Sequence, residues 1–362
     1  MVLNFLNWLK ILRKNGVDRE YVQRAWNISA EKLRMLPFSF RDWFVLRNKL
    51  KNLDLKEPPI FIIGHWRSGT THLHNLLTQD PKFGYISFLQ SVAHPAFITG
   101  ESLKSSIGKR VSSGKRPMDN MYVSLNTPHE EEFALMNMSF YHGLLNFPQK
   151  ARHYFKTYVS FENASRKLKE KWKKAYLQIL KKITYVNGGK RLVLKNPPNT
   201  ARIETLLEIF PDAKFIHIYR NPYVVYSSTL HMRQKLLNRT ALQKIDKKQL
   251  ESDVLFFYEE LMKKFFVAEK LIPPGNLLEV KYEDLEQNPC QELKRIYEGL
   301  NIPDFALVEK SFVDYIDSNK NYKKNEHLID DEIVEKINKH WSFAFDKWKY
   351  EPPQLLEMSK SK

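Results

Sequence analysis

The chain has 362 residues, 43% hydrophobic and 27% charged, without a low-complexity tract or repeat, so its composition excludes extensive disorder. Its single cysteine, Cys290, excludes an intrachain disulfide and argues for a reducing compartment rather than for a secreted, disulfide-rich protein. The net charge of +17 predicts an anionic partner, and charge alone does not choose between nucleic acid, an acidic membrane and a polyanionic nucleotide.

Residues 1 to about 55 are predicted to be helical, with a break at Pro37. Polar residues interrupt the apolar run of residues 1–12 at every third position, which is typical of a helical stripe and not of a signal peptide. No segment reaches the length that spans a bilayer. We therefore expect a soluble, cytoplasmic protein whose first helix packs on its own domain. The alternative is that this helix lies on a membrane surface beside Arg13 and Lys14.

A short apolar run at 60–63 predicts a buried strand that leads into a glycine-containing loop and then a helix. The Walker pattern G-x-x-x-x-G-K-[ST] is met at Gly64, Gly69 and Thr71, but Thr70 stands where the lysine belongs. That lysine faces the β and γ phosphates of a nucleoside triphosphate. Its absence argues against ATP hydrolysis and for a less highly charged ligand.

Three further strands are predicted at 191–194, 214–219 and 276–282, with a helix at 201–210 between the first two. Alternating strands and helices predict an α/β fold with a central parallel sheet. In such sheets ligands bind at the carboxyl ends of the strands, where Gly64, Lys195 and Arg220 follow. The stretch from 86 to 187 is expected to be mostly helical and to form the substrate side.

The residues at these strand ends resemble those of the sulfotransferases that use 3′-phosphoadenosine 5′-phosphosulfate (PAPS). The resemblance covers most of residues 58–350. In that family a G-x-x-R-S-G-T-T loop wraps the 5′-phosphosulfate, and five residues of this chain match it in order. They are Arg67, Ser68, Gly69, Thr70 and Thr71. Gly69 would let the backbone approach an oxyanion, the following helix would direct amide donors toward it, and Arg67 would add charge.

The resemblance implies a P-loop-like three-layer α/β fold, with a central parallel sheet flanked by helices, in a single domain over 1–362. Residues 1–55 would form N-terminal helices, 56–300 the α/β core, and 301–362 a nucleotide-covering loop and closing helix. Within the last part, 318–323 resembles the covering loop, so Tyr322 and Lys323 are candidate nucleotide contacts. A solvated basic turn is the alternative for this loop.

The family's second signature is an arginine after a strand and a serine eight residues later, which both bind the 3′-phosphate. Arg220 and Ser228 fit it. Lys195 matches a lysine that lies near the bridging oxygen of the phosphosulfate, where an ammonium stabilises the leaving group. The alternative for Lys195 is a surface lysine after a strand.

The general base is harder to assign from the sequence. Relatives that act on steroids and phenols carry a histidine two residues after the lysine, but this chain has Pro197 there. The tyrosylprotein enzymes place a glutamate where this chain offers Phe88 and Gln90. Both usual bases are missing, so a third arrangement is expected.

Residues 128–135 resemble the P-x-E-[DE]-E-F-A-L motif of a largely microbial branch, in which an acidic residue faces the acceptor. We expect His129 and Glu130 to supply the base, without separating them, and Glu132 stays open as a third candidate. The alternative is that the glutamates, in the first turn of a helix, only favour its dipole. His65 is a weaker candidate.

The predicted reaction moves the sulfuryl group of PAPS to an acceptor hydroxyl, with no metal, no nucleic acid and an undetermined oligomeric state. An aromatic and methionine-rich stretch at 133–141 could line a pocket for a hydrophobic alcohol such as a steroid, or form core. A carbohydrate acceptor would instead use the basic stretch 150–195, and a phenol is a further alternative. A P-loop kinase and a non-catalytic anion-binding protein are the more distant ones.

Overall fold

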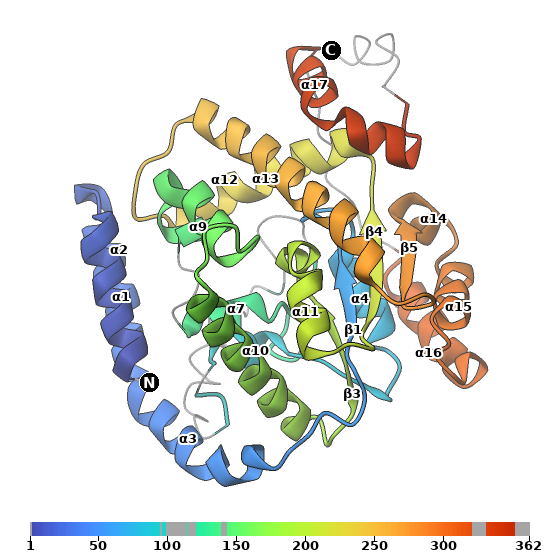
Figure 1. Cartoon of the computed structure of the whole chain (residues 1–362), viewed down its shortest axis with the longest axis horizontal. Coiled ribbons are helices and arrows are strands. Elements are labelled where there is room, and N and C mark those ends of the chain that lie inside the picture. The colour runs from blue at the N-terminus through green and yellow to red at the C-terminus, as the bar shows by residue number, and fades with distance from the viewer. Residues whose placement is uncertain are drawn as a thin grey trace.

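A parallel β-sheet forms the centre of the protein (Figure 1). The computed structural model describes residues 2–94, 96–98, 114, 121–138, 143–320 and 331–351. Within these residues five strands pair in the order β2-β3-β1-β4-β5, all parallel. The strands are β1 (Ile60–Ile63), β2 (Phe83–Gly84), β3 (Arg191–Lys195), β4 (Lys214–Tyr219) and β5 (Leu277–Lys281). The predicted α/β class and four predicted strands are confirmed, whereas β2 is too short to give a periodic pattern.

Helices cover both faces of the sheet, because each strand is apolar on both sides. Ile60 and Ile62 pack in one core with the helices on the right of Figure 1, and Phe61 and Ile63 point into the other. The first face is covered by α4 (Thr70–Leu77), α14 (Tyr282–Gln287), α15 (Pro289–Gly299) and α16 (Phe305–Ser318). The second is covered by α10 (Arg166–Val186), α11 (Ile203–Ile209), α12 (Pro222–Thr240), α13 (Lys247–Ala268) and α17 (Asp331–Trp348).

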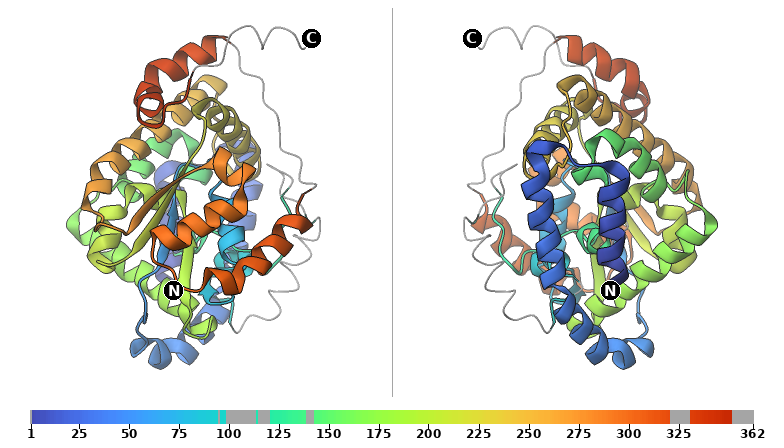
Figure 2. Two further views of the ribbon diagram at one scale, coloured as in Figure 1. Left: turned by 90° about the vertical axis from the view of Figure 1, so that its right-hand side faces the viewer. Right: turned by 90° about the vertical axis from the view of Figure 1, so that its left-hand side faces the viewer.

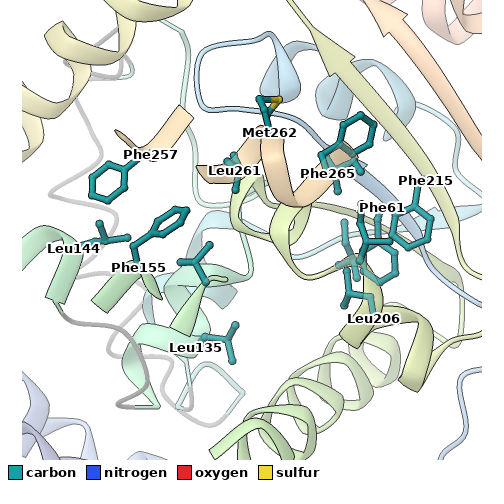
Figure 3. Packing of buried hydrophobic residues seen from close by; sticks show 14 of the residues in the cluster. Phe61, Leu135, Leu144, Phe155, Leu206, Phe215, Phe257, Leu261, Met262 and Phe265 are labelled. Atoms are coloured by element: carbon teal, nitrogen blue, oxygen red, sulfur yellow. The ribbon is translucent and has the colours of Figure 1, made fainter. Parts of the chain in front are cut away.

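The larger core joins the sheet to the helices of the substrate side. Figure 3 shows Phe61 and Phe215 of the sheet beside Leu206 of α11, while Phe155 and Phe257 pack further along the same cluster. The Phe61 and Phe215 rings stack with centroids 5.4 Å apart. This part of the chain contains α5 (Phe88–Val92), α7 (Glu132–Asn137), α8 (Gly143–Asn146), η2 (Pro148–Lys150) and α9 (Ala151–Tyr158). The remaining short turns are η1 (Arg19–Tyr21), η3 (Pro197–Ala201) and η4 (Glu269–Leu271).

The three N-terminal helices lie together on one side of the molecule, on the left of Figure 1 and facing the viewer on the right of Figure 2. They are α1 (Val2–Asn15), α2 (Val22–Arg34) and α3 (Leu36–Lys51). Trp8 of α1 is fully buried and donates through Nε1 to Ser29 Oγ (2.9 Å), so the first helix packs on its own protein as expected. The helical section breaks at Met35, and Pro37 lies in the first turn of α3, where it needs no N–H. No described helix is long and apolar enough to cross a membrane.

A buried ion pair attaches α3 to α10. Lys182 Nζ donates to Asp42 Oδ2 (2.8 Å), and both side chains are almost wholly inaccessible. Burial lowers the pKa of Lys182. Asp42 Oδ2 also accepts from the backbone N–H of Ile98 (3.1 Å), so one carboxylate holds both α10 and the segment that follows α5.

Asp42→Ala should lower the free energy of unfolding by about 3 kcal/mol, because it leaves the Lys182 ammonium buried without this carboxylate. Denaturant unfolding at neutral pH measures the change. Asp54→Ala is the matched control, because Asp54 is 96% exposed and its contact with Lys181 is long, at 3.9 Å. This variant should unfold like the parent. Equal stability of Asp42→Ala and the parent would contradict this role of the pair.

Candidate active site

The loop between β1 and α4 requires glycine at two positions. Gly64 has φ +138°, and a Cβ there would lie 2.3 Å from the backbone oxygen of Ile218 on β4. Gly69, the residue before α4, has φ +95°, and its Cβ would lie 2.2 Å from the ring of Tyr282. At both positions a side chain is excluded by the positive φ angle and by the neighbouring atoms that a Cβ would overlap. The loop is therefore pressed against its neighbours, with the amides of the first turn of α4 at its end.

Two predicted phosphate-binding signatures meet at this loop. Arg67 Nε donates to Ser228 Oγ on α12 (2.9 Å), and Arg220, which follows β4, donates through Nη1 to the Arg67 carbonyl (3.4 Å). The Arg220 guanidinium also lies 4.1 Å from the centre of the Tyr282 ring. Arg67 has a left-handed backbone (φ 71°), an uncommon conformation for a non-glycine residue that is often found at functional sites. Two segments far apart in the sequence thus bring two arginines and a serine together.

The other residues of the predicted loop are buried or half-buried. Ser68 and Thr70 are buried, the backbone N–H of Ser68 donates to the His65 carbonyl (3.2 Å), and Thr71 is half-buried in the first turn of α4. Tyr322 and Lys323 lie outside the described residues.

Lys195 ends β3 and is 2% exposed, so the alternative of a surface lysine is wrong. Its Nζ donates to Glu130 Oε1 (2.5 Å). Because Ile62 of β1 pairs with Lys195, the lysine stands one strand away from the loop that starts at Gly64. Arg220 stands on the opposite side of that loop, after β4.

The three adjacent glutamates have different surroundings. Glu132 is buried and accepts two hydrogen bonds from Arg202 (2.6 and 2.9 Å) and one from Asn196 (2.7 Å). Glu131 is fully buried and accepts from Tyr176 and Asn199, both at 2.8 Å. Burial raises the pKa of Glu131 to about 7.

Glu130 is the member of this run whose side chain is partly accessible, with 19% exposed. The alternative that placed all three glutamates in the first helical turn is wrong: α7 begins at Glu132, with Glu131 as its cap residue. Since Glu130 precedes the helix, stabilisation of the helix dipole does not explain it. Glu132 has a structural role instead, because its carboxylate is occupied by hydrogen bonds from Arg202 and Asn196.

The two candidate histidines differ as well. His129 is half-buried, with Nδ1 2.7 Å from Ser91 Oγ, and its ring lies near those of Phe88 and Phe133, at centroid distances of 5.0 and 4.7 Å. His65 is 1% exposed and its Nδ1 lies 2.8 Å from the Trp66 carbonyl. Burial lowers the pKa of His65 to about 3, so it stays neutral and is poorly suited to accept a proton.

The segment after β3 supplies a polar network that the sequence interpretation missed. Asn196, Asn199 and Arg202 bind the glutamates, as described above. Thr200 Oγ1 accepts from the Gly64 N–H (2.8 Å) and donates to the Gly64 carbonyl (3.1 Å), which fixes the start of the loop. The signal was available in principle, because polar residues directly after a buried strand belong to the ligand-binding edge of a parallel sheet.

Two stretches were predicted to contact the acceptor, and their described residues lie partly in the core and partly on the surface. Ala134, Leu135 and Met136 of the 133–141 stretch are core, and its end at 139–141 lies outside the described residues. In the basic stretch 150–195, Lys169 and Lys173 both bind Glu208, as expected for a solvated helix face. Among the described residues, no three His, Cys, Asp or Glu side chains form a group that could hold a metal ion.

A parallel α/β sheet with this loop, and with basic residues at the adjacent strand ends, is typical of proteins that bind an anionic ligand at the carboxyl ends of their strands. A model of the sulfotransferase family matches residues 58–306, and the chain therefore belongs to this family of enzymes, whose general sulfuryl donor is PAPS. That excludes the nucleotide kinase and the non-catalytic binding protein as alternatives.

The chain is similar to the omega-hydroxy-beta-dihydromenaquinone-9 sulfotransferase Stf3 of Mycobacterium bovis and of Mycobacterium tuberculosis. Each is 31% identical over 352 residues, which cover 96% of this chain and 90% of the relative. Among solved structures, sulfotransferase STF9 from Mycobacterium avium has a TM-score of 0.67 at 19% identity, over 90% of this chain and 86% of that one. STF1 from Mycobacterium tuberculosis H37Rv has 0.65 at 18% identity, over 85% of each. These two structures confirm the fold.

The raised pKa of Glu131 predicts a pH-dependent stability. Between its ordinary value of 4.5 and about 7 the folded state holds a proton that the unfolded state releases, so this group makes stability fall as pH rises through that window. Glu131→Gln removes the effect. The stability of the variant relative to the parent should therefore increase by up to about 3 kcal/mol from pH 4.5 to 7.5, measured by denaturant unfolding. A difference that stays constant over this range would show that the carboxyl titrates normally.

Proposed function

We propose that this enzyme transfers the sulfuryl group of PAPS to the hydroxyl of a hydrophobic, lipid-like alcohol. One observation carries the proposal: the β1–α4 loop lies between Lys195, at the end of β3, and Arg220, after β4, with Ser228 bonded to Arg67 within the loop. This is the crevice outside the carboxyl ends of the strands, where parallel α/β sheets bind ligands.

The loop and its neighbours form two adjacent anion sites. Arg67 and the backbone amides of 68–71 hold the 5′-phosphosulfate, with the positive end of the α4 dipole toward it. Arg220 and Ser228 hold the 3′-phosphate. Because Arg67 contacts both Ser228 and Arg220, the two sites share one arginine and fit a nucleotide that carries phosphate at both positions.

Glu130 and Lys195 carry out the proton and charge transfers. The acceptor oxygen attacks sulfur as its proton passes to the Glu130 carboxylate, and the bond between sulfur and the bridging phosphate oxygen breaks. Lys195 stabilises the negative charge that develops on that leaving oxygen. Glu130 is preferred over His129 as the base because its bond to Lys195 places it beside the group that stabilises the leaving oxygen. His129, held by Ser91, then helps to position the acceptor.

The acceptor is proposed to be hydrophobic because aromatic rings pack on His129, the residue next to the candidate base. Phe88 and Phe133 both contact the His129 ring. The Stf3 relatives are named for a menaquinone-derived lipid acceptor with an omega-hydroxyl group. A sterol has the same chemistry of one hydroxyl on a large apolar body, so it remains within the proposal. A polyanionic sugar fits less well, because Lys182 and Lys195 in the basic stretch are buried against Asp42 and Glu130.

Incubation with labelled PAPS and a panel of acceptors tests the function. The panel contains a long-chain primary alcohol, a hydroxylated isoprenoid quinone, a sterol, a phenol and a glycan. We expect a sulfated product from the hydrophobic alcohols and stabilisation of the protein by adenosine 3′,5′-bisphosphate.

Arg220→Ala should weaken bisphosphate binding about ten- to a hundredfold, while Arg239→Ala, at an exposed position near the end of α12, should not. Absence of any product, together with absence of stabilisation, would refute the proposal. Sulfation of the glycan or the phenol alone would refute only the choice of acceptor.

Glu130→Gln should lower kcat about 10²- to 10⁴-fold and leave bisphosphate affinity within a few-fold of the parent. Glu131→Gln is the matched control in the same run, because a neutral amide resembles the protonated form that its raised pKa favours, and its kcat should change little. Steady-state kinetics and calorimetric titration provide the two measurements. If His129→Asn abolishes turnover while Glu130→Gln retains it, the base is the histidine.

A further inference from the structure

The outer face of α3 carries an exposed cluster of aromatic side chains. Phe40, Trp43 and Phe44 are 60%, 48% and 59% exposed, at the i, i+3 and i+4 spacing that places them on one side of the helix. Arg47 lies over Trp43 and Phe44, at 5.2 and 5.0 Å from their ring centres. We call these four residues the α3 aromatic face. The opposite side of α3 is buried through Ser39, Asp42 and Leu46.

This exposure is concentrated in one region. Of the fifteen exposed large hydrophobic side chains among the described residues, nine belong to α1, α2 and α3. Trp26, on α2, is 69% exposed. The three helices form one side of the molecule (Figure 2, right). Single exposed hydrophobic side chains are common on protein surfaces, but a concentration of them in one region marks an interaction surface.

The charge of the same region selects an anionic occupant. Residues 2–51 contain eleven Lys and Arg and four Asp and Glu. The acidic residue of α3, Asp42, is buried against Lys182, so the exposed charges of this helix are all basic. They are Arg41, Arg47, Lys49 and Lys51. A second copy of the chain would bring two basic faces together, whereas anionic headgroups complement them.

The inner side of α3 leads to the acceptor side of the candidate active site. Asp42 accepts from the Ile98 N–H in the segment that follows α5, and α5 carries Ser91, which bonds His129. Asp42, Ile98 and Ser91 thus link α3 to the histidine beside the candidate base. A surface docked on α3 would therefore lie on the same side as the acceptor.

We propose that α3 docks the enzyme on an anionic lipid bilayer. Phe40, Trp43 and Phe44 enter the headgroup region, where aromatic rings are favoured, and Arg41 and Arg47 bind lipid phosphates. The membrane contact is thereby assigned to α3 and not to the first helix, whose Trp8 is buried. The role in catalysis rests on the proposed function: docking delivers an alcohol that resides in the bilayer.

Flotation with phosphatidylcholine vesicles, with and without phosphatidylglycerol, tests the docking. The parent should bind the anionic vesicles, lose binding at high salt, and show a blue shift of tryptophan fluorescence. Phe40→Ser with Phe44→Ser should weaken binding about tenfold or more. The control pair is Val267→Ser with Leu307→Ser, whose parent side chains are 72% and 77% exposed on other helices, and it should bind like the parent.

Two results would overturn the docking. One is equal vesicle binding by the α3 pair and the parent. The other is a parent dimer in sedimentation that the α3 pair abolishes, which would make the face a contact between copies of the chain.

A comparison of two acceptors separates docking from the transfer reaction. With PAPS, the α3 pair should sulfate a short, water-soluble alcohol as fast as the parent, which also shows that it is folded, and lose most of its rate on a long-chain alcohol held in anionic vesicles. Equal loss on both acceptors would overturn the role of docking in delivery. If the parent sulfates neither acceptor, the proposed function fails, and vesicle binding still decides the docking by itself.

Discussion

The site depends on the parallel register of three strands. Ile62 of β1 lies opposite Lys195 of β3, and Ile63 lies opposite His217 of β4, so the three strands end at one edge of the sheet. Parallel pairing turns three chain segments, each followed by polar residues, into one crevice. The tight packing of Gly64 against β4 and its bonds to Thr200 then fix where the loop leaves the sheet.

Buried polar contacts around the crevice separate structural carboxylates from the candidate catalytic one. Glu132 is neutralised by Arg202, and Glu131 is held by neutral donors in a site that favours its protonated form. A buried carboxylate without such partners would be costly, so these bonds permit three adjacent glutamates at the edge of a hydrophobic core. Glu130, bonded to Lys195, is left at the accessible side. The network fixes the motif so that, of the three carboxylates, the one bonded to Lys195 remains partly accessible.

The parts of the fold that could be predicted from the sequence were those with a local signal. Runs of apolar, β-rich residues gave four strands, and the glycines between a strand and a helix gave the loop. Helix boundaries were less certain: the predicted helix at 201–210 is a 3-10 turn from Pro197 followed by α11 from Ile203. The glutamates could not be distinguished because they are adjacent and chemically identical. Their partners Tyr176 and Arg202 lie 45 and 70 residues away along the chain.

The sequence by itself therefore determined the fold class, the glycine loop after β1 and the resemblance to the sulfotransferases, because each can be recognised from local patterns of residues. Only the tertiary structure decided that Lys195 is buried against Glu130, that Arg67 meets Ser228, and that the aromatic side chains of α3 face outward. The physical reason is the same in each case. Burial and ion pairing are properties of the space around a side chain, and that space is filled by segments from elsewhere in the chain.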